Sequence, residues 1–589
     1  MTKIFGTLGM NDERLEELVG DMASSMQHEP WHRIDTYKEA IFGCGHISLG
    51  KVNPEKQPIW NHDESKCIVM AGKIFDYESD KLELIQKGYH FKYACNDLEY
   101  ILNSYEEYGK DCFKRLNGIF ALAIWDNKTD RLVLANDRFG FRPLFYSIHN
   151  HGIAFASEVK ALLKDKQISR EINWKAWGDF FIFGWIFGND TYYKDILSLP
   201  PASVLEYKNG KTKITTYWDY RKIKLDRKHD ETYFISKGAN LIEQAIKRQI
   251  ENLERATCFL TGGYDSRGIA ATIKKMKGQK LKVNTYVGCT YNADQLESIN
   301  EEAIRNKIDF NHKCILEPII SKEVADHLGF EHNIVFCTNH EEKSYFDKWL
   351  HITDGMTDAH LWAMNVANRL PQDTFVNFDG AVADVFLKGY FIAQNELKLP
   401  SIIYRPMLFL RIFQKEKIDY IKKHFHIKLA KKMIARSRIG FIKELSKIPL
   451  FKKTRTFLFF GGRTRRSIAL SIYSVITTKT ECFCPYLDND LMNFALSIPP
   501  EMMYRQNLYM KMLERIDPDI MKIPSSSNSK NIADPSYVAK IKEAKSMFRE
   551  LLSQEKEMAE NPSVTTDSHT CPIETTEPFF LKWYNTFNT

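Results

Sequence analysis

The residues with the clearest chemical meaning form a glycine-rich loop at 259–266, with the sequence Phe-Leu-Thr-Gly-Gly-Tyr-Asp-Ser. The apolar run 257–260 before the glycines is typical of a buried strand, and a helical pattern begins at Arg267. Glycines here let backbone N–H groups approach an anion, toward which the helix points its positive end. No Gly-Lys-Ser/Thr follows, which excludes a Walker A loop. Asp265 is a candidate Mg²⁺ ligand, since carboxylates and phosphate oxygens hold this ion together; a Gly-Gly turn without chemistry is the alternative.

The bulk composition is that of a globular protein of more than one domain. The chain has 589 residues, of which 44% are apolar and 27% charged. It has no run of about 18 apolar residues, so we expect no transmembrane helix, and its N-terminus turns polar too soon for a signal peptide. Its eleven cysteines form no CxxC pair. We therefore expect a reduced, cytoplasmic protein without a zinc site.

The positive charge is concentrated in one segment. Residues 405–466 hold 19 Lys or Arg against 3 Asp or Glu, whereas the whole chain has a net charge of only +7. Nucleic-acid binding by the whole protein is therefore not favoured. Apolar residues also recur there at helical spacing, at 421, 425, 429 and 434. Two interpretations stay open: solvated basic helix faces, or a surface for an acidic partner such as anionic lipid, an acidic polymer or another protein.

Two regions with different patterns must position these residues. The first 165 or so residues indicate short strands and turns, with a hairpin formed by 119–125 and 132–135. The stretch around 198–218 is proline-marked and resembles a linker. From about 230, helices and strands alternate, which predicts a parallel sheet with flanking helices. The predicted elements are helix 231–250, strand 257–260, helix 267–277, strand 281–287 and helix 295–306.

Several ordered segments resemble the asparagine synthetase family. The loop 259–266 is similar to the family's Ser-Gly-Gly-x-Asp-Ser pyrophosphatase loop, and 379–390 to its Gly-x-Gly-x-Asp-Glu-Leu-Phe segment. Residues 484–500 resemble its Pro-Phe-Leu-Asp…Leu-Pro-Pro segment. Three more segments resemble its glutaminase domain: 107–121, 136–144 and 155–162. The resemblance covers nearly the whole chain.

The resemblance implies an α/β protein of two parts. The first is an αββα glutaminase-like domain of the N-terminal-nucleophile type, and the second is a parallel-sheet domain like the adenine-nucleotide α-hydrolases (PP-loop type). We expect the boundaries as follows: 1–205 for a degenerate type 2 glutamine amidotransferase domain, 206–229 for a linker, 230–545 for the asparagine synthase domain with its basic helical segment 405–466, and 546–589 for a mobile tail.

The resemblance places the N-terminal nucleophile at Thr2. Glutaminases of this class use an N-terminal Cys, freed by loss of Met1, whose own α-amine acts as base. Thr is a weaker nucleophile than Cys near neutral pH, and Lys3 replaces the usual Gly. The segment 46–49, His-Ile-Ser-Leu, lacks the Arg expected to hold the substrate carboxylate.

The glutamine-binding segment of the family, Asn-Gly-Glu-Ile-Tyr-Asn, corresponds to residues 71–76. Gly72 is kept, but Ala71 replaces the Asn that donates to the oxyanion, and Lys73 places a cation where a carboxylate is expected. Losing one such donor costs ~10²–10³ in rate. Asp97 matches the family's other glutamine-binding position, with a helix N-cap as its alternative role. We predict that this domain does not hydrolyse glutamine.

The synthetase site is better kept. By resemblance, Asp265 and Asp384 hold Mg²⁺ on the phosphates of ATP, and Asp294 contacts the substrate. Thr261 for Ser and Val385 for Glu are milder changes. The expected nucleotide and pyrophosphate contacts are Leu260, Thr261, Gly262, Gly263, Asp265, Ser266, Gly288 and Gly380.

The family's catalytic lysine has no unambiguous counterpart. Lys511, Lys522 and Lys530 lie near the expected place, and at most one of them stabilises the transition state; each alone is also explained as a surface lysine.

Together these features predict an ATP-dependent amide-forming ligase that activates a carboxylate, aspartate by default, as an acyl-adenylate and transfers ammonia or an amine. One alternative is a tailoring enzyme that amidates a sugar acid, a peptide or a secondary metabolite. Another is a non-catalytic scaffold whose segment 405–466 recruits an acidic partner. The sequence leaves open whether the chain forms a homodimer.

Overall fold

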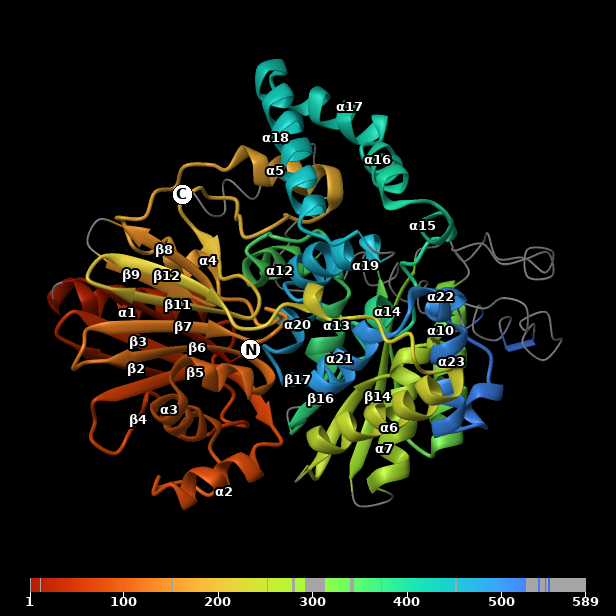
Figure 1. Ribbon diagram of the computed structural model, residues 1–589, viewed down its shortest axis with the longest axis horizontal. Helices are drawn as coiled ribbons and strands as arrows, with labels where there is room; N and C mark the ends of the chain where they lie inside the picture. Colours follow the sequence, from red (N-terminus) through yellow and green to blue (C-terminus); the bar gives the residue numbers. More distant parts are fainter. Residues whose placement is uncertain are drawn as a thin grey trace.

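Figure 1 shows the computed structural model of the chain, with two sheet domains side by side and a helical projection above them. The structure describes residues 2–525 except 11, 150–151, 252, 278–280, 292–312, 339–343, 372 and 451–452; beyond 525 it describes only 539–540, 546 and 549–550. Asp294, Lys530, the predicted helix 295–306 and nearly all of the predicted tail lie outside the described residues.

The N-terminal domain is a sandwich of two antiparallel sheets. The first sheet has the order β10-β8-β9-β1-β3-β2 and the second β12-β11-β7-β6-β5-β4. Helix α1 (Asp12–Met26) packs on the first sheet and α3 (Asp97–Tyr108) on the second, which gives four layers, αββα. The strands are β1 (Lys3–Leu8), β2 (Arg33–Glu39), β3 (Phe42–Ser48), β4 (Ile59–Trp60), β5 (Lys66–Phe75), β6 (Asn117–Asp126), β7 (Arg131–Asn136), β8 (Phe145–His149), β9 (Gly152–Ala156), β10 (Leu197–Ser198), β11 (Ser203–Lys208) and β12 (Lys211–Thr216).

Alternation along the strands explains the sandwich. Every second side chain of β5, β6 and β7 enters the core between the sheets, and Val69, Trp125 and Leu134 are among them. The side chains between them enter the core under α3. The predicted hairpin 119–125/132–135 is confirmed as β6 and β7.

The stretch predicted as a linker is wrong in its first half. Residues 206–216 complete β11 and form β12, which pair around the Lys208-Asn209-Gly210 turn and belong to the second sheet. Prolines at 200 and 201 precede β11 rather than interrupt it, so they do not exclude a strand here.

The second domain is built on a parallel sheet with the order β15-β14-β13-β16-β17. Its strands are β13 (Arg255–Phe259), β14 (Lys282–Tyr291), β15 (Glu331–Thr338), β16 (Val376–Phe378) and β17 (Glu481–Phe483). The chain runs outward from β13 through β14 to β15 and then crosses to β16 on the other side of β13. Ligands of such sheets bind where the order reverses, beyond the carboxyl ends of the strands. Asp265 and Asp384 lie in the first turns of the helices that follow β13 and β16, which explains how residues 119 positions apart meet.

Helices cover this sheet and extend from it. The predicted helix 231–250 is confirmed as α6 (Glu231–Ile250), capped by the Asp230 side chain, which accepts from the Tyr233 N–H. The predicted helix 267–277 begins three residues earlier, as α7 (Tyr264–Lys277). The remaining helices are α2 (Glu78–Gln86), α4 (Val159–Leu162), α5 (Trp174–Phe183), α10 (Lys313–Leu328), α12 (Phe346–Thr353), α13 (Ala363–Arg369), α14 (Ala383–Phe386), α15 (Gln394–Lys398), α16 (Ser401–Ile412), α17 (Lys415–His424), α18 (Ile427–Ser446), α19 (Thr454–Phe459), α20 (Ile472–Ile476), α21 (Asn489–Ser497), α22 (Pro500–Met503) and α23 (Asn507–Ile516). In the described part of the chain, no helix combines the length and the apolar character needed to cross a bilayer.

The basic segment 405–466 is divided between solvent and interior. Arg465 is buried and donates to the carbonyl oxygen of Leu199 at 2.6 Å, and Arg466 donates to the carbonyl of Gly188 at 3.5 Å. Lys453 is buried against the Leu496 carbonyl at 3.1 Å, and its burial lowers its pKa to about 7. Solvated helix faces therefore describe α17 and much of α18, but not Lys453, Arg465 and Arg466, which donate to backbone carbonyls inside the molecule.

Candidate active sites

Thr2 lies buried at the start of the first sheet, just before β1. Its hydroxyl oxygen is 3.4 Å from Nη2 of Arg142, which is also 3.5 Å from Glu481 of the second domain. The position expected for a nucleophile is thus inside the sandwich and close to the domain boundary.

The carboxylate of Asp97 is already occupied by cations and donors of the chain itself. Lys73 Nζ lies 2.7 Å from Asp97 Oδ1, the Tyr77 hydroxyl donates to the same oxygen at 3.0 Å, and the Ile74 N–H donates to Oδ2 at 2.9 Å. Asn53 Nδ2 approaches Oδ2 at 3.2 Å. Burial alone would lower the pKa of Lys73, but the Asp97 charge raises it, so the ammonium stays protonated.

The alternative reading of Asp97 as a helix N-cap is wrong. Asn96 is the N-cap of α3, and its side chain accepts from the Glu99 N–H at 3.0 Å. Asp97 follows it with a fully buried side chain that turns toward β5. Gly72, on that strand, has φ +125°, and a Cβ there would stand 2.0 Å from the Ile119 carbonyl oxygen, so only glycine fits this close strand approach.

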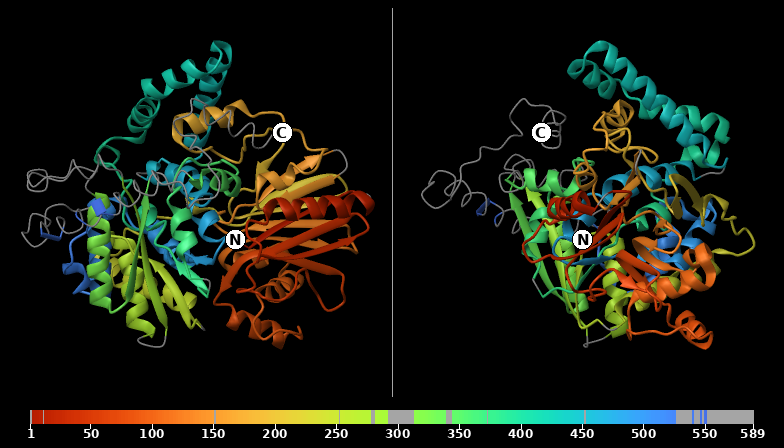
Figure 2. Two further views of the ribbon diagram at one scale, coloured as in Figure 1. Left: turned by 180° about the vertical axis from the view of Figure 1, so that it is seen from behind. Right: turned by 90° about the vertical axis from the view of Figure 1, so that its left-hand side faces the viewer.

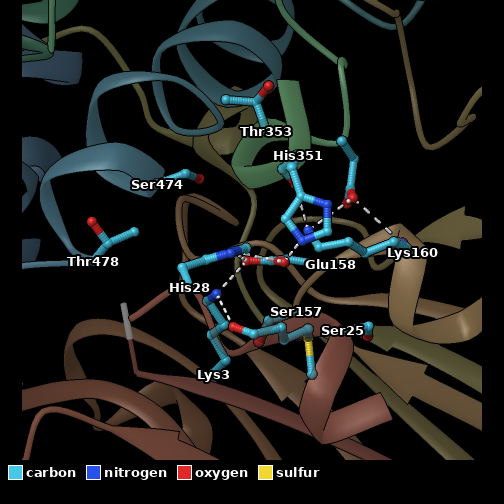
Figure 3. Close-up of polar contacts among 12 residues, drawn as sticks. Lys3, Ser25, His28, Ser157, Glu158, Lys160, His351, Thr353, Ser474 and Thr478 are labelled. Carbon is cyan, nitrogen blue, oxygen red and sulfur yellow. Dashed lines mark hydrogen bonds and ion pairs between the residues drawn. The ribbon is translucent and has the colours of Figure 1, made fainter. Parts of the chain in front are cut away.

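A buried charge cluster joins the two domains next to Thr2. Figure 3 shows Lys3, His28, Glu158, Lys160 and His351 converging from β1, the end of α1, the start of α4 and α12. Lys3 Nζ lies 2.6 Å from Glu158, which also accepts from His28 Nε2 at 2.9 Å. Lys160 pairs with Glu158 and, at 3.1 Å, with Asp354 beyond the end of α12.

The charges of this cluster balance. Burial lowers the pKa of His28 well below 6.5, so the ring is neutral and donates from Nε2. Burial opposes ionisation of Glu158, yet His28, Lys160 and Lys3 hold its pKa well below 4.5. Two ammonium groups, Lys3 and Lys160, therefore face two carboxylates, Glu158 and Asp354. The cluster is buried between the two domains, where an unpaired charge would be costly.

The glycine-rich loop after β13 is held in a tight turn by its own hydroxyls. The Thr261 N–H donates to Ser266 Oγ at 3.0 Å, and the Gly263 N–H donates to Thr261 Oγ1 at 3.3 Å. Leu260 is buried, and its N–H donates to the Tyr286 carbonyl on β14. Gly262 and Gly263 lie between these anchors, as a loop that cradles phosphates requires.

Gly380 brings the loop after β16 against this turn. A Cβ at Gly380 would stand 2.9 Å from the Ser266 nitrogen and 3.1 Å from the Asp265 carbonyl carbon. Gly288 lies on β14, two residues past the partner of Phe259, where a Cβ would stand 2.8 Å from Val366. That contact explains this glycine by packing, and its nucleotide contact stays a prediction.

We expect Gly380→Ala to lower pyrophosphate release from ATP about tenfold or more, because the new methyl group displaces the phosphate loop. Stability should fall by only about 1–3 kcal/mol, the usual cost of overpacking. Gly461→Ala is the matched control, since a Cβ there meets nothing within 4 Å. Equal rates for Gly380→Ala and wild type would contradict the close approach.

Two carboxylates of the site each have a cationic partner within the chain. Asp265 Oδ2 is 2.8 Å from Lys388 Nζ, and Asp384 Oδ2 is 3.5 Å from Arg463 Nη1. Burial and then the Asp265 charge raise the pKa of Asp384, and burial raises the pKa of the neighbouring Asp379 to about 6. The three carboxylates thus gather negative charge at the carboxyl ends of β13 and β16.

This arrangement fits a divalent cation bound together with phosphates. Asp265 Oδ1 is buried and has no hydrogen-bond partner among the described residues, and burial, followed by the Asp265 charge, raises the pKa of Asp384. A bound cation would stabilise both carboxylates in their charged form. Among the described residues no three His, Cys, Asp or Glu side chains converge as a complete metal site. Mg²⁺ prefers a ligand set of one or two carboxylates together with phosphate oxygens of a nucleotide.

Sequence reasoning missed several residues of this site. Lys388 follows Asp384 by four positions, and Arg463 was counted only as part of the basic segment. Buried Arg267 donates to the carbonyls of Ile523 at 2.7 Å and Pro524 at 2.8 Å, which ties the chain beyond α23 to the phosphate loop. Four-residue spacing after a predicted ligand could have indicated Lys388; nothing local distinguishes Arg267 or Arg463.

The candidate lysines 511 and 522 are both exposed and paired away from this loop. Lys511 lies 2.8 Å from Glu231 on α6, and Lys522 lies 2.6 Å from Asp519. The structure does not bring either to Asp265, whereas Lys388 is there.

A four-layer glutaminase-like sandwich followed by a parallel sheet with a phosphate loop at its switch point defines a class of two-domain amidotransferases. The profile described as "Glutamine amidotransferase domain" matches residues 1–218, and that of "Asparagine synthase" matches residues 237–449. The chain belongs to the asparagine synthetase family, whose members are carbon–nitrogen ligases.

Three relatives show the range of this similarity. Asparagine synthetase (glutamine-hydrolyzing) 3 of Bacillus subtilis strain 168 is 25% identical over 85% of this chain and 82% of its own length. Amidase chry2 of Gibberella zeae is 26% identical over 59% of this chain and 50% of its own. Amidase chyE of Penicillium rubens is 23% identical over 50% of this chain and 42% of its own length.

Proposed function

We propose that the chain is an ATP-dependent amide-forming ligase that takes ammonia or an amine directly and does not hydrolyse glutamine. The observation that carries the ligase half is the pairing of Asp265 with Lys388 and Asp384 with Arg463 around the 261–266 loop. Carboxylates for a metal and cations for phosphates stand together at the edge of the sheet where nucleotides bind.

The residues divide the work of adenylation. Backbone N–H groups of the 261–266 loop and the Ser266 hydroxyl bind the pyrophosphate part of ATP. Asp265 and Asp384 would hold Mg²⁺, which neutralises charge on the departing pyrophosphate. Lys388 and Arg463, no longer needed by these carboxylates, then contact phosphate oxygens.

The chemistry balances in two steps. A substrate carboxylate oxygen attacks the α-phosphorus of ATP in line, the bond to the β-phosphate oxygen breaks, and pyrophosphate leaves. The acyl carbon of the resulting adenylate is then attacked by the nitrogen of ammonia or an amine. AMP leaves with the bonding pair of the acyl C–O bond, and the nitrogen loses a proton to give the amide.

The first half of the test is pyrophosphate release from Mg-ATP with a panel of acids, each with and without ammonium or glutamine. Release with aspartate that ammonium raises and glutamine does not would support an ammonia-dependent asparagine synthetase. No release with any acid, together with no ATP binding, would overturn the proposal in favour of a scaffold.

A second candidate, a tailoring ligase for a sugar acid, a peptide or a secondary metabolite, is favoured by the two relatives named as amidases. It predicts pyrophosphate release with another acid of the panel and none with aspartate. The two candidates share every residue of the nucleotide site, so only the acid separates them.

The ion pair between Lys73 and Asp97 supports the loss of glutaminase activity. The carboxylate that would receive the α-ammonium of glutamine already holds an ammonium from the chain at 2.7 Å. Binding glutamine would require breaking this part-buried pair and separating the fully buried Asp97 carboxylate from its cation, which is unfavourable.

We therefore expect Thr2→Cys alone to give only trace glutaminase activity, even when mass spectrometry shows that Met1 is removed. The triple variant Thr2→Cys/Ala71→Asn/Lys73→Glu should release glutamate from glutamine about 10²-fold or more faster than Thr2→Cys, because it restores an oxyanion donor and clears Asp97.

Lys66 provides the matched control for this series. It lies on the same strand β5 but pairs with Glu106 at 3.1 Å away from Asp97. Thr2→Cys/Ala71→Asn/Lys66→Glu should stay inactive. Glutaminase activity in Thr2→Cys alone, equal to that of the triple variant, would show that Lys73 does not block the site.

A further inference from the structure

The helices α16, α17 and α18 form a helical arm, residues 401–450, that projects from the body of the molecule (Figures 1 and 2). One face of α18 packs against α5 of the first domain. The buried residues of α18 are Ala430, Met433, Ile434, Ser437, Gly440, Phe441 and Leu445. At the base of the arm, Arg405 donates to the carbonyls of Ile448 and Pro449, which joins α16 to the end of α18.

The outer surface of the arm is unusually apolar. Of the 18 large hydrophobic side chains exposed among the described residues, nine lie in the arm, which is less than a tenth of the chain. They are Ile402, Ile403, Met407, Leu410, Tyr420, Ile427, Ile439, Ile442 and Leu450; Ile402, Leu410 and Leu450 are 80%, 73% and 75% exposed. Single exposed apolar residues are ordinary, but a concentration of them marks an interaction surface.

The spacing of these residues makes stripes rather than a scatter. On α16 they stand at 403, 407 and 410, and on α18 at 439 and 442. Positions three and four apart share one face of a helix. On α18 this face is distinct from the one that packs on α5, so it has no partner among the described residues.

The arm is also strongly basic. Residues 401–450 hold 13 Lys or Arg and 3 Asp or Glu. Two of the acids already pair locally, Asp419 with Lys422 and Glu444 with Lys447. The exposed cations of α17 and α18 are Lys415, Lys417, Lys422, Lys423, Lys428, Lys431, Lys432, Arg436, Arg438 and Lys443.

We propose that the helical arm docks on an anionic membrane surface. A lipid interface meets both properties at once: apolar side chains enter the boundary between headgroups and acyl chains, while Lys and Arg contact the headgroups. A nucleic acid or an acidic polymer would satisfy the cations but leave the isoleucines and leucines in water. A second copy that docks through its own arm would present the same positive charge and be repelled.

The proposal does not depend on the ligase activity. It places the two-domain protein at a membrane surface through the helical arm. An acidic protein with an apolar groove is the remaining competitor, and the experiment below separates it from a bilayer.

Flotation of the full-length protein with vesicles tests the proposal. With vesicles of phosphatidylcholine containing about 30 mol% phosphatidylglycerol, we expect most of the protein to float, and about tenfold less with phosphatidylcholine alone. Raising the salt from about 0.1 to about 0.5 M should release part of it, because screening weakens the electrostatic share of binding.

Two double variants separate the apolar and the electrostatic contributions. Ile439→Ser/Ile442→Ser and Lys431→Glu/Lys432→Glu should each lower the bound fraction on anionic vesicles about tenfold. Leu82→Ser/Ile85→Ser, an exposed apolar pair three residues apart on α2, and Lys211→Glu/Lys213→Glu on β12 are the matched controls and should bind like wild type.

Unchanged melting temperatures of the arm variants show that they fold. No flotation of the wild-type protein, equal flotation with neutral and anionic vesicles, or equal loss in arm and control variants would each overturn the proposal. Absence of vesicle binding together with salt-dependent binding to a purified acidic protein would assign the arm to a protein partner instead.

Discussion

Replacing Asp265 by Asn is expected to lower pyrophosphate release at least about 10²-fold, the scale on which a single charge-stabilising group contributes to catalysis. The amide keeps the shape of the side chain but cannot hold Mg²⁺ as a carboxylate does. Asp384→Asn should have an effect of the same size, because the proposed function has the two carboxylates hold one cation. Raising the Mg²⁺ concentration should restore part of the rate in either variant, which a loss of fold would not allow.

The control for the Asp265→Asn and Asp384→Asn variants is a residue on the surface of the same domain. Asp326 on α10 is exposed and pairs with Lys322, so Asp326→Asn should change the rate by less than about twofold. Asp265→Asn also leaves Lys388 without its partner, and the melting temperature must be measured beside the rate. Wild-type pyrophosphate release in Asp265→Asn would remove the basis for the proposed nucleotide site.

Replacing Glu158 by Gln is expected to destabilise the protein by about 3–5 kcal/mol, the usual cost of breaking a buried ion pair from one side. Glu158 alone faces Lys3, His28 and Lys160, and its loss leaves two buried ammonium groups with Asp354 only. The midpoint of urea denaturation measures the effect. Glu243→Gln, which breaks a pair with exposed Lys275, should cost about 1 kcal/mol or less.

The stability that Glu158 contributes depends on pH, because its pKa differs between the folded and unfolded states. This pKa is lower in the folded state than its ordinary 4.5. The stabilisation is therefore complete above about pH 5 and is lost as the pH falls through the folded-state pKa. Wild type should lose stability relative to Glu158→Gln on acidification, and parallel profiles for the two proteins would contradict the pairing.

Local patterns were sufficient for the elements that carry the site. The helix predicted at 231–250 is α6 with the same bounds, and the predicted strand, glycines and helix form the loop at 259–266. The error at 206–229 arose because β12 is exposed and rich in Lys and Thr, so pairing with β11 rather than burial makes it a strand.

What sequence reasoning could not supply were contacts between distant residues. The sequence shows the unusual Lys73. It does not show that the Lys73 ammonium contacts Asp97, 24 residues away, because that contact depends on how β5 passes α3. The arginines of 463–466 look alike in the sequence, yet one faces Asp384 and two are buried against the first domain. Their roles depend on where each arginine lies in the fold, and no local sequence pattern indicates this.

The pair of Lys73 and Asp97 has a consequence for how this protein is supplied with nitrogen. A glutaminase couples its ligase to the cellular glutamine pool, because an empty amino-acid site waits for that ligand. Under the proposed function, the Lys73 ammonium of the chain itself occupies this site, so glutamine abundance would not enter the reaction. The rate of the proposed ligase would then follow the concentration of unprotonated ammonia or amine, and it should therefore rise with pH.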